Sequence, residues 1–166
     1  NSFAPGFQTA FNTAFARKLG INPMDEKSAG FISDTLKAMT EAKLDFTVFF
    51  TALTRLAGGE PDSIITVQFD DKNAGQAWLE NWKVMSGFAN GMSQETLDEM
   101  ARANPVIIAR NHQVETAINQ ANGGNRAHFD RLLDAVQNPF SQDEKYAEFQ
   151  IPPTPEEVVT KTFCGT

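Results

Sequence analysis

The sequence has a single cysteine, Cys164, and only two histidines, His112 and His128. One thiol cannot form an internal disulfide, and so few Cys and His residues provide no cluster at the spacing of a zinc site. We therefore expect no disulfide framework and no metal ligands in this chain. Such sparing use of cysteine is typical of a reducing compartment, so the expected location is cytoplasmic.

Basic residues are also scarce, with 14 Lys and Arg against 21 Asp and Glu and a formal net charge of -7. No stretch gathers the basic residues into a stripe that could neutralise successive phosphates, which argues against nucleic acid as a partner. No apolar run approaches the roughly 20 residues that cross a bilayer. No basic start followed by an apolar segment resembles a signal peptide, so no membrane partner is expected.

Loops that hold phosphates are missing as well. Neither GxGxxG nor GxxxxGK[ST] occurs, and Gly58-Gly59 and Gly123-Gly124 are interpreted as helix stops. No His-Arg-Asp triplet is present, and Asp45, which is followed by Phe46 and Thr47, is interpreted as a solvated helix residue. Phosphoryl and nucleotidyl chemistry needs cations, magnesium-binding carboxylates and a phosphate loop together. The sequence thus predicts no catalytic or cofactor-binding residue in this chain.

Apolar residues, by contrast, are plentiful and follow helical spacing. They make up 41% of the 166 residues, and the aromatic set of 14 Phe but one Tyr favours dry packing. The 3.6-residue period predicts an all-α fold, an irregular helical bundle with a proline-rich C-terminal tail. The stripes are Phe7, Phe11, Phe15 and Leu19; Ile32, Leu36 and Met39; Phe46, Phe49, Phe50, Leu53 and Leu56; Trp78, Trp82 and Met85; Leu97 and Met100; Val114, Ala117, Ile118 and Ala121; and Phe129, Leu132, Leu133 and Val136.

The expected organisation is one domain of four segments within a larger protein, because the chain opens on Asn1-Ser2 without methionine. The segments are a helical bundle over 1–57, a loop or short extended segment over 58–75, helices with a hairpin over 76–138, and a proline-rich tail over 139–166. Glu60-Pro61-Asp62 is turn chemistry and Ile64 to Phe69 is rich in β-formers, which leaves loop and extended structure both open. The tail ends in a short helix that begins at Thr154 with a capping box.

Helix boundaries are marked by familiar signals. Gly20 is expected to end the first helix and Ser93 to cap the helix that follows it. Asn104-Pro105 should close that helix, because a residue before proline is pushed out of the α region. Acidic pairs fall in turns or first helical turns, where negative charge is favoured for structural reasons. They are Asp70-Asp71, Asp143-Glu144 and Glu156-Glu157.

Five other side chains could carry function, and each has a structural interpretation that is favoured. Arg110 lies between an apolar run and a helix start, where a guanidinium can clamp a carboxylate but more often serves as a structural tie. His112 is interpreted as an ordinary surface side chain and His128 as no stronger a candidate, since no second residue is placed to orient either as a base. Trp78 and Trp82 share one helix face, which favours core packing over a ligand cage.

An ordered set of residues resembles the C-terminal region of the selenoprotein O family. The set is Asn104-Pro105, Ile108, Arg110-Asn111, Ala117-Ile118, Ala121, Phe129, Leu132-Leu133, Pro139-Phe140, Tyr146, Pro152-Pro153 and Cys164-Gly165-Thr166. Arg17-Lys18-Leu19-Gly20 and Asp45-Phe46-Thr47 also look like family segments. The chain departs from the family after Trp78, where Trp82, Lys83 and Met85 replace the usual tyrosine and arginines.

The resemblance implies a parent protein with a pseudokinase fold that transfers AMP from ATP, with Mg²⁺, to Ser, Thr or Tyr hydroxyls of other proteins. The family's nucleotide-binding, metal-binding and catalytic residues lie upstream of the matched region, so none is carried over. Only Cys164 is carried over, and the resemblance implies that it is a redox-active terminal cysteine that pairs with a cysteine near the active site. Implied partners are an upstream kinase-like domain and the protein substrates.

Three hypotheses follow for the function of this chain. The leading one is a C-terminal helical domain that buttresses the catalytic part of such a transferase and carries the redox cysteine. The alternative is a noncatalytic helical module for protein–protein interaction. A self-contained hydrolase that uses His112 or His128 is remote, because neither residue has an evident orienting partner.

Overall fold

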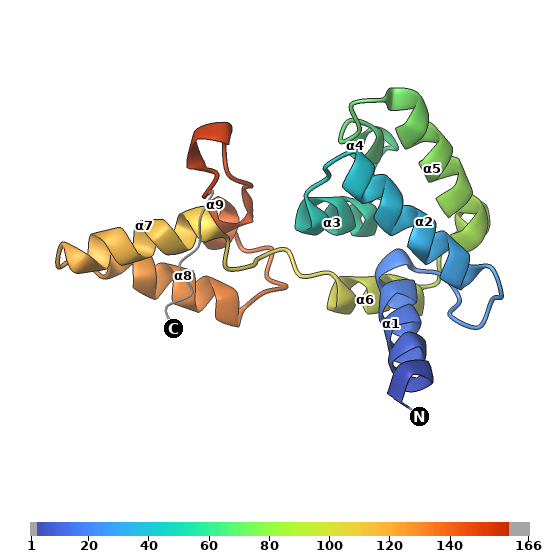
Figure 1. Cartoon of the computed structure of the whole chain (residues 1–166), viewed down its shortest axis with the longest axis horizontal. Helices are drawn as coiled ribbons and strands as arrows, with labels where there is room; N and C mark the ends of the chain where they lie inside the picture. Colours follow the sequence, from blue (N-terminus) through green and yellow to red (C-terminus); the bar gives the residue numbers. More distant parts are fainter. Residues whose placement is uncertain (1–2, 160–166) are drawn as a thin grey trace. The chain divides into compact units, whose positions relative to one another are not determined.

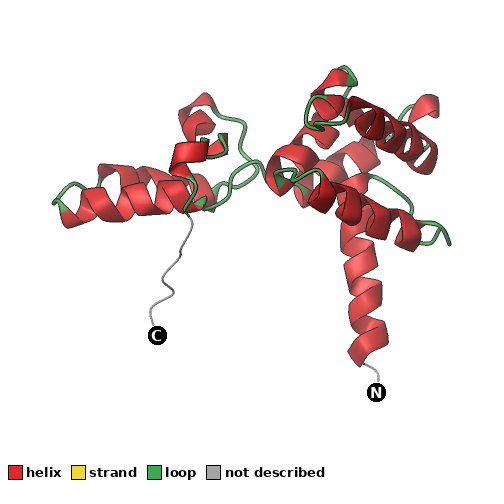
Figure 2. Ribbon diagram, turned by 45° about the horizontal axis from the view of Figure 1, so that its top comes forward, coloured by secondary structure: helices red, strands yellow, loops and turns green. Residues whose placement is uncertain are grey.

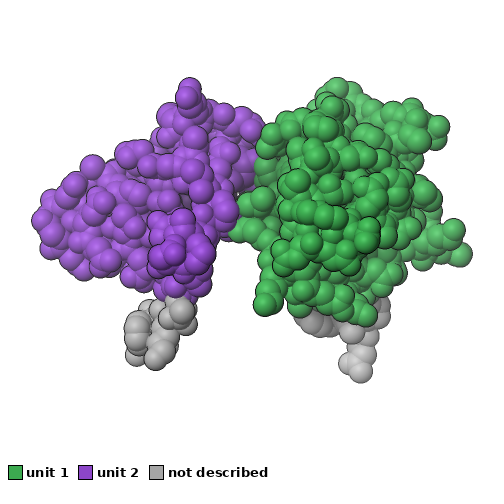
Figure 3. Space-filling model, turned by 90° about the horizontal axis from the view of Figure 1, so that it is seen from above, with its two compact units in different colours: residues 1–104 green, residues 105–166 purple. Residues whose placement is uncertain are grey.

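The computed structural model of the chain describes residues 3–159. These residues form helices and turns and contain no strand, which confirms the all-α prediction for the described part (Figure 2). The chain divides at Asn104 and Pro105 into two compact units (Figure 3). The predicted segments 1–57, 58–75, 76–138 and 139–166 within one domain stay a prediction, and the compact units give a different partition.

Unit 1 is a bundle of helices around one apolar core. Helix α1 packs against α2, α3 and α6, and α4 packs against both α3 and α5 (Figure 1). The elements of unit 1 are α1 (Phe3–Leu19), α2 (Ser28–Glu41), α3 (Phe46–Ala57), α4 (Ser63–Thr66), α5 (Lys72–Ser86), the 3-10 turn η1 (Phe88–Asn90) and α6 (Gln94–Ala103).

Both tryptophans lie in the core of unit 1, as their spacing predicted. Trp82 is fully buried, and its Nε1 donates to the backbone oxygen of Leu19 at 2.8 Å. Trp78 is 7% exposed, and its Nε1 donates to Thr35 Oγ1 at 3.0 Å. Because each indole N–H has a protein acceptor, the rings can be buried without an unsatisfied donor. The pair therefore ties α5 to α1 and α2.

Helix ends in unit 1 follow the sequence signals closely. Ser93 caps α6 by accepting from the Thr96 N–H at 3.1 Å. Helix α1 ends before Gly20, whose φ of +65° suits glycine, and a Cβ there would meet Met100 Sδ at 2.5 Å. Asp45 is not the solvated helix residue that was expected. It caps α3, where its side chain accepts from Val48 N at 2.9 Å.

The extended alternative for Ile64 to Phe69 is wrong, because Ser63–Thr66 form the short helix α4. Ile65 and Phe69 are 0% and 3% exposed, so two residues spaced by four both face the core. Lys72 Nζ donates to three carbonyls at the end of this turn, those of Thr66, Val67 and Phe69. Burial of two side chains on one face of a helical turn thus outweighs the β-propensity of the segment.

Unit 2 is built on a helical hairpin, as predicted. Helices α7 (Asn111–Asn122) and α8 (Ala127–Gln137) pack against each other, and the turn at Gly123 and Gly124 joins them (Figure 1). The chain then forms η2 (Glu144–Tyr146), α9 (Ala147–Gln150) and η3 (Pro155–Glu157). Its own apolar cluster consists of Val106, Ile107, Ala117, Leu132, Ala135, Tyr146 and Phe149.

Candidate functional site

Cys164, the one residue predicted to be functional, lies outside the described residues. The structure does describe the segment that leads toward it, residues 139–159, here called the stem. The stem begins beside the linker of unit 2, where Pro139 O accepts from Val106 N at 2.8 Å and from Ile107 N at 3.0 Å. It then folds back on the α7–α8 hairpin, and the contacts that hold it there form the candidate site.

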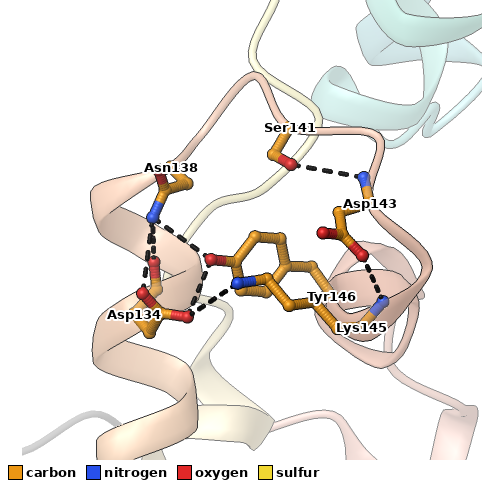
Figure 4. Close-up of polar contacts among 6 residues, drawn as sticks. All are labelled: Asp134, Asn138, Ser141, Asp143, Lys145 and Tyr146. Carbon is orange, nitrogen blue, oxygen red and sulfur yellow. Dashed lines mark hydrogen bonds and ion pairs between the residues drawn. The ribbon is translucent and has the colours of Figure 1, made fainter.

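A hydrogen-bonded group of side chains fixes the first part of the stem to α8 (Figure 4). Tyr146 is 4% exposed, and its hydroxyl donates to Asp134 Oδ2 at 2.7 Å. Asn138 Nδ2 donates to the Tyr146 hydroxyl at 3.2 Å and to the Asp134 backbone oxygen at 2.8 Å. Lys145 Nζ lies 3.4 Å from Asp134 Oδ2 and 4.4 Å from the centroid of the Tyr146 ring. Four side chains thus join η2 to the last turns of α8.

The protonation of Asp134 is coupled to this contact. The hydrogen bond from the Tyr146 hydroxyl, together with the nearby Lys145 ammonium, holds the pKa of the Asp134 carboxyl below its ordinary value. A carboxyl whose pKa is lowered in the folded state stabilises that state above its ordinary pKa. This stabilisation is lost as the pH falls through the lowered value.

The turn before η2 is organised by its own polar side chains. Ser141 Oγ accepts from Asp143 N at 3.2 Å, and Asp143 Oδ1 accepts from Lys145 N at 3.0 Å (Figure 4). Asp143 is therefore the N-cap of η2, which agrees with the structural interpretation of the Asp143-Glu144 pair. The cap fixes the direction in which Tyr146 enters the core of unit 2.

Phe149 forms the second attachment of the stem. Its side chain is fully buried, and its ring centroid lies 5.7 Å from that of His128 and 5.8 Å from the guanidinium carbon of Arg131. Arg131 also pairs with the carboxylate of Glu148. Gln113 Nε2, on the other helix of the hairpin, donates to the Glu148 backbone oxygen at 3.4 Å. Both helices of the hairpin therefore hold α9.

His112 is not the surface side chain that the sequence suggested, because it is only 9% exposed. It occupies the second position of α7, and Gln113 Nε2 lies 3.2 Å from its Nε2. Glu157, in the predicted capping box at η3, accepts from Thr154 N at 2.9 Å. That hydrogen bond is the main cause of a lowered Glu157 pKa, and the nearby His112 contributes to it. The last described turn of the stem thus lies close to the start of α7.

His128 is half-buried, and the described residues provide no hydrogen-bond partner for its Nε2. No hydroxyl or thiol in the described part is hydrogen-bonded to either imidazole, so the structure places no nucleophile beside a base. Arg110 is buried at the start of α7, with 7% exposure. Its role as a clamp or a structural tie stays a prediction.

Carboxylates do not converge in the described part of the chain. Within residues 3–159 no group of three or more His, Cys, Asp or Glu side chains is placed to hold a metal ion. The predicted pairs act locally instead: Asp71 accepts from Asn73 N at 2.9 Å as the cap of α5, and Asp143 and Glu157 cap the turns of the stem. Among the described helices, none combines the length and apolar character needed to cross a membrane.

Sequence comparison assigns the chain to a family. The sequence model described as "Protein adenylyltransferase SelO" matches residues 1–137, more than three quarters of the chain. The chain belongs to the SelO family. SelO relatives named "Protein nucleotidyltransferase YdiU" are 37% identical over 161 residues in a Ruegeria species and 34% identical over 166 residues in Nitrobacter winogradskyi. A YdiU protein from a Jannaschia species is 35% identical over 166 residues.

These SelO relatives are much longer than the chain. The alignments cover 96%, 99% and 100% of the chain but only 31%, 33% and 34% of the Ruegeria, Nitrobacter and Jannaschia proteins. The chain thus spans about a third of the curated relatives that it matches. The family resemblance stated from the residues of the sequence is confirmed, and the relatives are nucleotidyltransferases by name. Similarity extends beyond residue 137 into the stem, since two of the alignments run over 166 residues.

Sequence reasoning missed how the stem is held on the hairpin. Asp134 lies on α8 and Asn138 directly follows the last residue of that helix, but nothing local indicates that Tyr146 reaches this pair. The burial of His112 was missed for the same reason, because it results from packing in unit 2 rather than from the local pattern.

Proposed function

We propose that this chain is the C-terminal helical domain of a SelO-type protein adenylyltransferase, which it supports without carrying out the chemistry. The longer polypeptide transfers AMP from ATP, with Mg²⁺, to Ser, Thr or Tyr hydroxyls of proteins. The observation that carries the proposal is the family match over residues 1–137, combined with relatives that cover the whole chain and are about three times as long.

In this proposal, ATP and Mg²⁺ bind to a part of the longer polypeptide outside this chain. Mg²⁺ prefers carboxylate and phosphate oxygens, and three carboxylates of the acidic pairs, those of Asp71, Asp143 and Glu157, serve as helix caps. Within residues 3–159 no three His, Cys, Asp or Glu side chains are grouped to hold a metal ion, which supports assigning the magnesium–nucleotide site to another part of the longer polypeptide. An upstream kinase-like domain of the same protein is the partner that holds the nucleotide and the protein substrate.

Two roles are proposed for the helical domain. Its two compact units buttress the catalytic part, and the stem carries Cys164 as a redox-active thiol. The stem contacts support the second role, because the Tyr146 and Phe149 attachments fix the segment that precedes the terminal residues. A disulfide between Cys164 and an upstream cysteine would form by oxidation of two thiols, with loss of two electrons and two protons to an oxidant such as oxidised glutathione.

Exposed apolar side chains on the hairpin support the alternative, a noncatalytic protein–protein interaction module. Ile118, Phe129 and Leu133 are 47%, 39% and 43% exposed. Phe129 and Leu133 are spaced by four on α8 and so share one helix face, and exposed apolar area of this kind is typical of interaction sites. This function needs no nucleotide chemistry anywhere in the longer polypeptide.

Titration calorimetry with Mg-ATP tests the proposal on the 166-residue chain and on the longer polypeptide. We expect no heat of binding above background for the chain and saturable binding for the longer polypeptide, which should also label a protein acceptor with AMP. Micromolar binding by the chain alone contradicts the supporting role. A longer polypeptide that neither binds ATP nor transfers AMP favours the interaction module.

A further inference from the structure

Two arginines from different helices line one hollow in unit 1. Arg17 lies in the last turn of α1 and Arg102 in the last turn of α6, and Figure 1 shows these two helices side by side. The cavity has a volume of about 240 Å³, and Glu99 and Ala103 complete its lining. We call this cavity the arginine pocket.

Neither guanidinium of the pocket is hydrogen-bonded or ion-paired within the described residues, and both arginines are exposed to solvent. Other arginines of the chain do pair with carboxylates: Arg55 with Glu60 at 2.7 Å, Arg126 with Asp130 at 3.6 Å, and Arg131 with Glu148. The chain has 21 acidic residues against 14 basic ones, so carboxylates are in excess. A guanidinium presents a planar set of donors that matches a carboxylate or phosphate. Water solvates these two exposed groups in the free chain, and their place in one hollow allows both to donate to the same external anion.

The two helix ends that carry the arginines are fixed to each other. Lys18 Nζ donates to the Ala103 backbone oxygen at 2.7 Å and to Asn104 Oδ1 at 3.3 Å. Asn104 is 3% exposed, and its Nδ2 donates to the Lys18 backbone oxygen at 3.0 Å. These reciprocal hydrogen bonds fix the distance between the ends of α1 and α6, and so between the Cα atoms of Arg17 and Arg102. Less ordering is then needed when an anion binds between them.

The net charge of the pocket indicates which anion fits. Arg17, Arg102 and the adjacent Lys18 are cationic, and Glu99 is anionic. The C-terminal ends of α1 and α6 each contribute the equivalent of about half a negative charge. Together with the three cationic side chains and the one anionic side chain, this gives the pocket a net charge of about +1. A singly charged carboxylate matches this balance. The several charges of a nucleotide phosphate chain exceed it, and Glu99 would repel them.

We propose that the arginine pocket binds the carboxylate of an acidic protein segment, with Arg17 and Arg102 as its two donors and Glu99 as the group that disfavours more highly charged anions. A purely structural role is the rival explanation, because arginine in the last turn of a helix is favoured by the helix dipole alone. That explanation predicts no saturable binding of any anion.

The arginine Nε–H resonances of the 166-residue chain provide the test, because NMR detects each guanidinium separately. The probes are a blocked Gly-Ser-Glu-Ser-Gly peptide, its glutamine counterpart and inorganic phosphate. We expect the Arg17 and Arg102 resonances to shift together and saturably with the glutamate peptide, and not with the glutamine peptide. The exposed Arg126, already paired with Asp130, is the internal reference and should shift only linearly.

Substitutions complete the test. Arg17→Gln and Arg102→Gln should each weaken binding of the glutamate peptide by roughly three- to fivefold, since each removes a charged hydrogen-bond donor that solvent partly screens. Arg126→Gln, the matched control on unit 2, should leave the affinity unchanged, and the backbone spectra should show that all three variants are folded. Linear shifts at Arg17 and Arg102 like those at Arg126 overturn the proposal. Saturation by phosphate without saturation by the glutamate peptide overturns the assignment to a carboxylate.

Discussion

Replacement of Tyr146 by phenylalanine tests how the stem is held on α8. Tyr146→Phe keeps a buried ring, since Tyr146 is 4% exposed, and deletes only the hydroxyl that donates to Asp134 at 2.7 Å and accepts from Asn138 at 3.2 Å. A net hydrogen bond contributes about 1 kcal/mol, and one to a charged group more. Because the Asp134 side chain is 55% exposed, solvent competes for it. We therefore expect a loss of about 1–1.5 kcal/mol in the stability of the stem attachment.

Hydrogen exchange measured by mass spectrometry reports this loss locally. A change of about 1–1.5 kcal/mol corresponds to roughly five- to tenfold faster exchange in peptides from the stem, if exchange occurs through local opening. Peptides from α3 and α5 in unit 1 should be unchanged. Asp134→Ala, which removes the acceptor, should have a similar effect, and the double substitution should cost little more than either single one, because both remove the same hydrogen bond.

The contribution of the contact between Tyr146 and Asp134 to stability should decrease at acid pH. Because the Asp134 pKa is lowered in the folded state, the difference between wild type and Tyr146→Phe is complete near pH 7. It shrinks as the pH falls below the ordinary carboxyl value of about 4. Asp130→Asn, in the same helix but in an exposed pair at 3.6 Å, is the control and should change nothing measurable. Unchanged stem exchange in Tyr146→Phe, or an equal effect of Asp130→Asn, refutes the reasoning.

Three further predictions concern the core and the thiol. Trp82→Phe should lower the free energy of unfolding in urea by about 1–3 kcal/mol, because it opens a void and removes the hydrogen-bond donor to the backbone oxygen of Leu19. An unchanged midpoint of urea unfolding contradicts the packing described. Gly75→Ala should lower the free energy of unfolding by about 1–3 kcal/mol, because the new Cβ would lie 2.9 Å from the buried Phe69 ring. Gly30→Ala, where nothing lies within 4 Å of a Cβ, should raise it by about 0.5–1 kcal/mol. Equal effects of the two substitutions in thermal unfolding would rule this out. Cys164 should be alkylated by iodoacetamide in the 166-residue chain and, without reductant, should form disulfide-linked dimers on a non-reducing gel, since the chain has no second cysteine; monomer alone after oxidation counts against this.

The helices with strong apolar stripes could be predicted from the sequence, and the short connecting elements could not. The stripe from Phe7 to Leu19 lies within α1, and the signals at Gly20 and Ser93 mark helix boundaries as expected. In contrast, Ile65 and Phe69 belong to a segment too short for a period to distinguish a turn of helix from a strand. Packing against α3 and α5 decides it, and that information is not local.

In the candidate site, too, the local contacts could be predicted from the sequence and the long-range contacts could not. The capping box at Thr154 and the cap at Asp143 depend on residues adjacent in the chain, so sequence reasoning could reach the first and the structural role of the second. The contact between Asp134 and Tyr146 joins residues on two different elements, and the arginine pocket joins α1 to α6 across more than 80 residues. Contacts between such distant residues depend on how the helices pack, so no local sequence pattern predicts them. The redox role of Cys164 rests on family resemblance and stays a prediction.

We propose that this chain supports adenylyl transfer without performing it, and that Cys164 connects its tail to the activity of the longer protein. The most direct measurement is transfer of AMP from ATP labelled at the α-phosphate to a protein acceptor, with and without reductant. The account predicts no transfer by the 166-residue chain, transfer by the longer polypeptide, and a response to reductant that Cys164→Ala abolishes. Labelling of the acceptor by the 166-residue chain alone, or the same reductant response in Cys164→Ala as in the wild type, would contradict it.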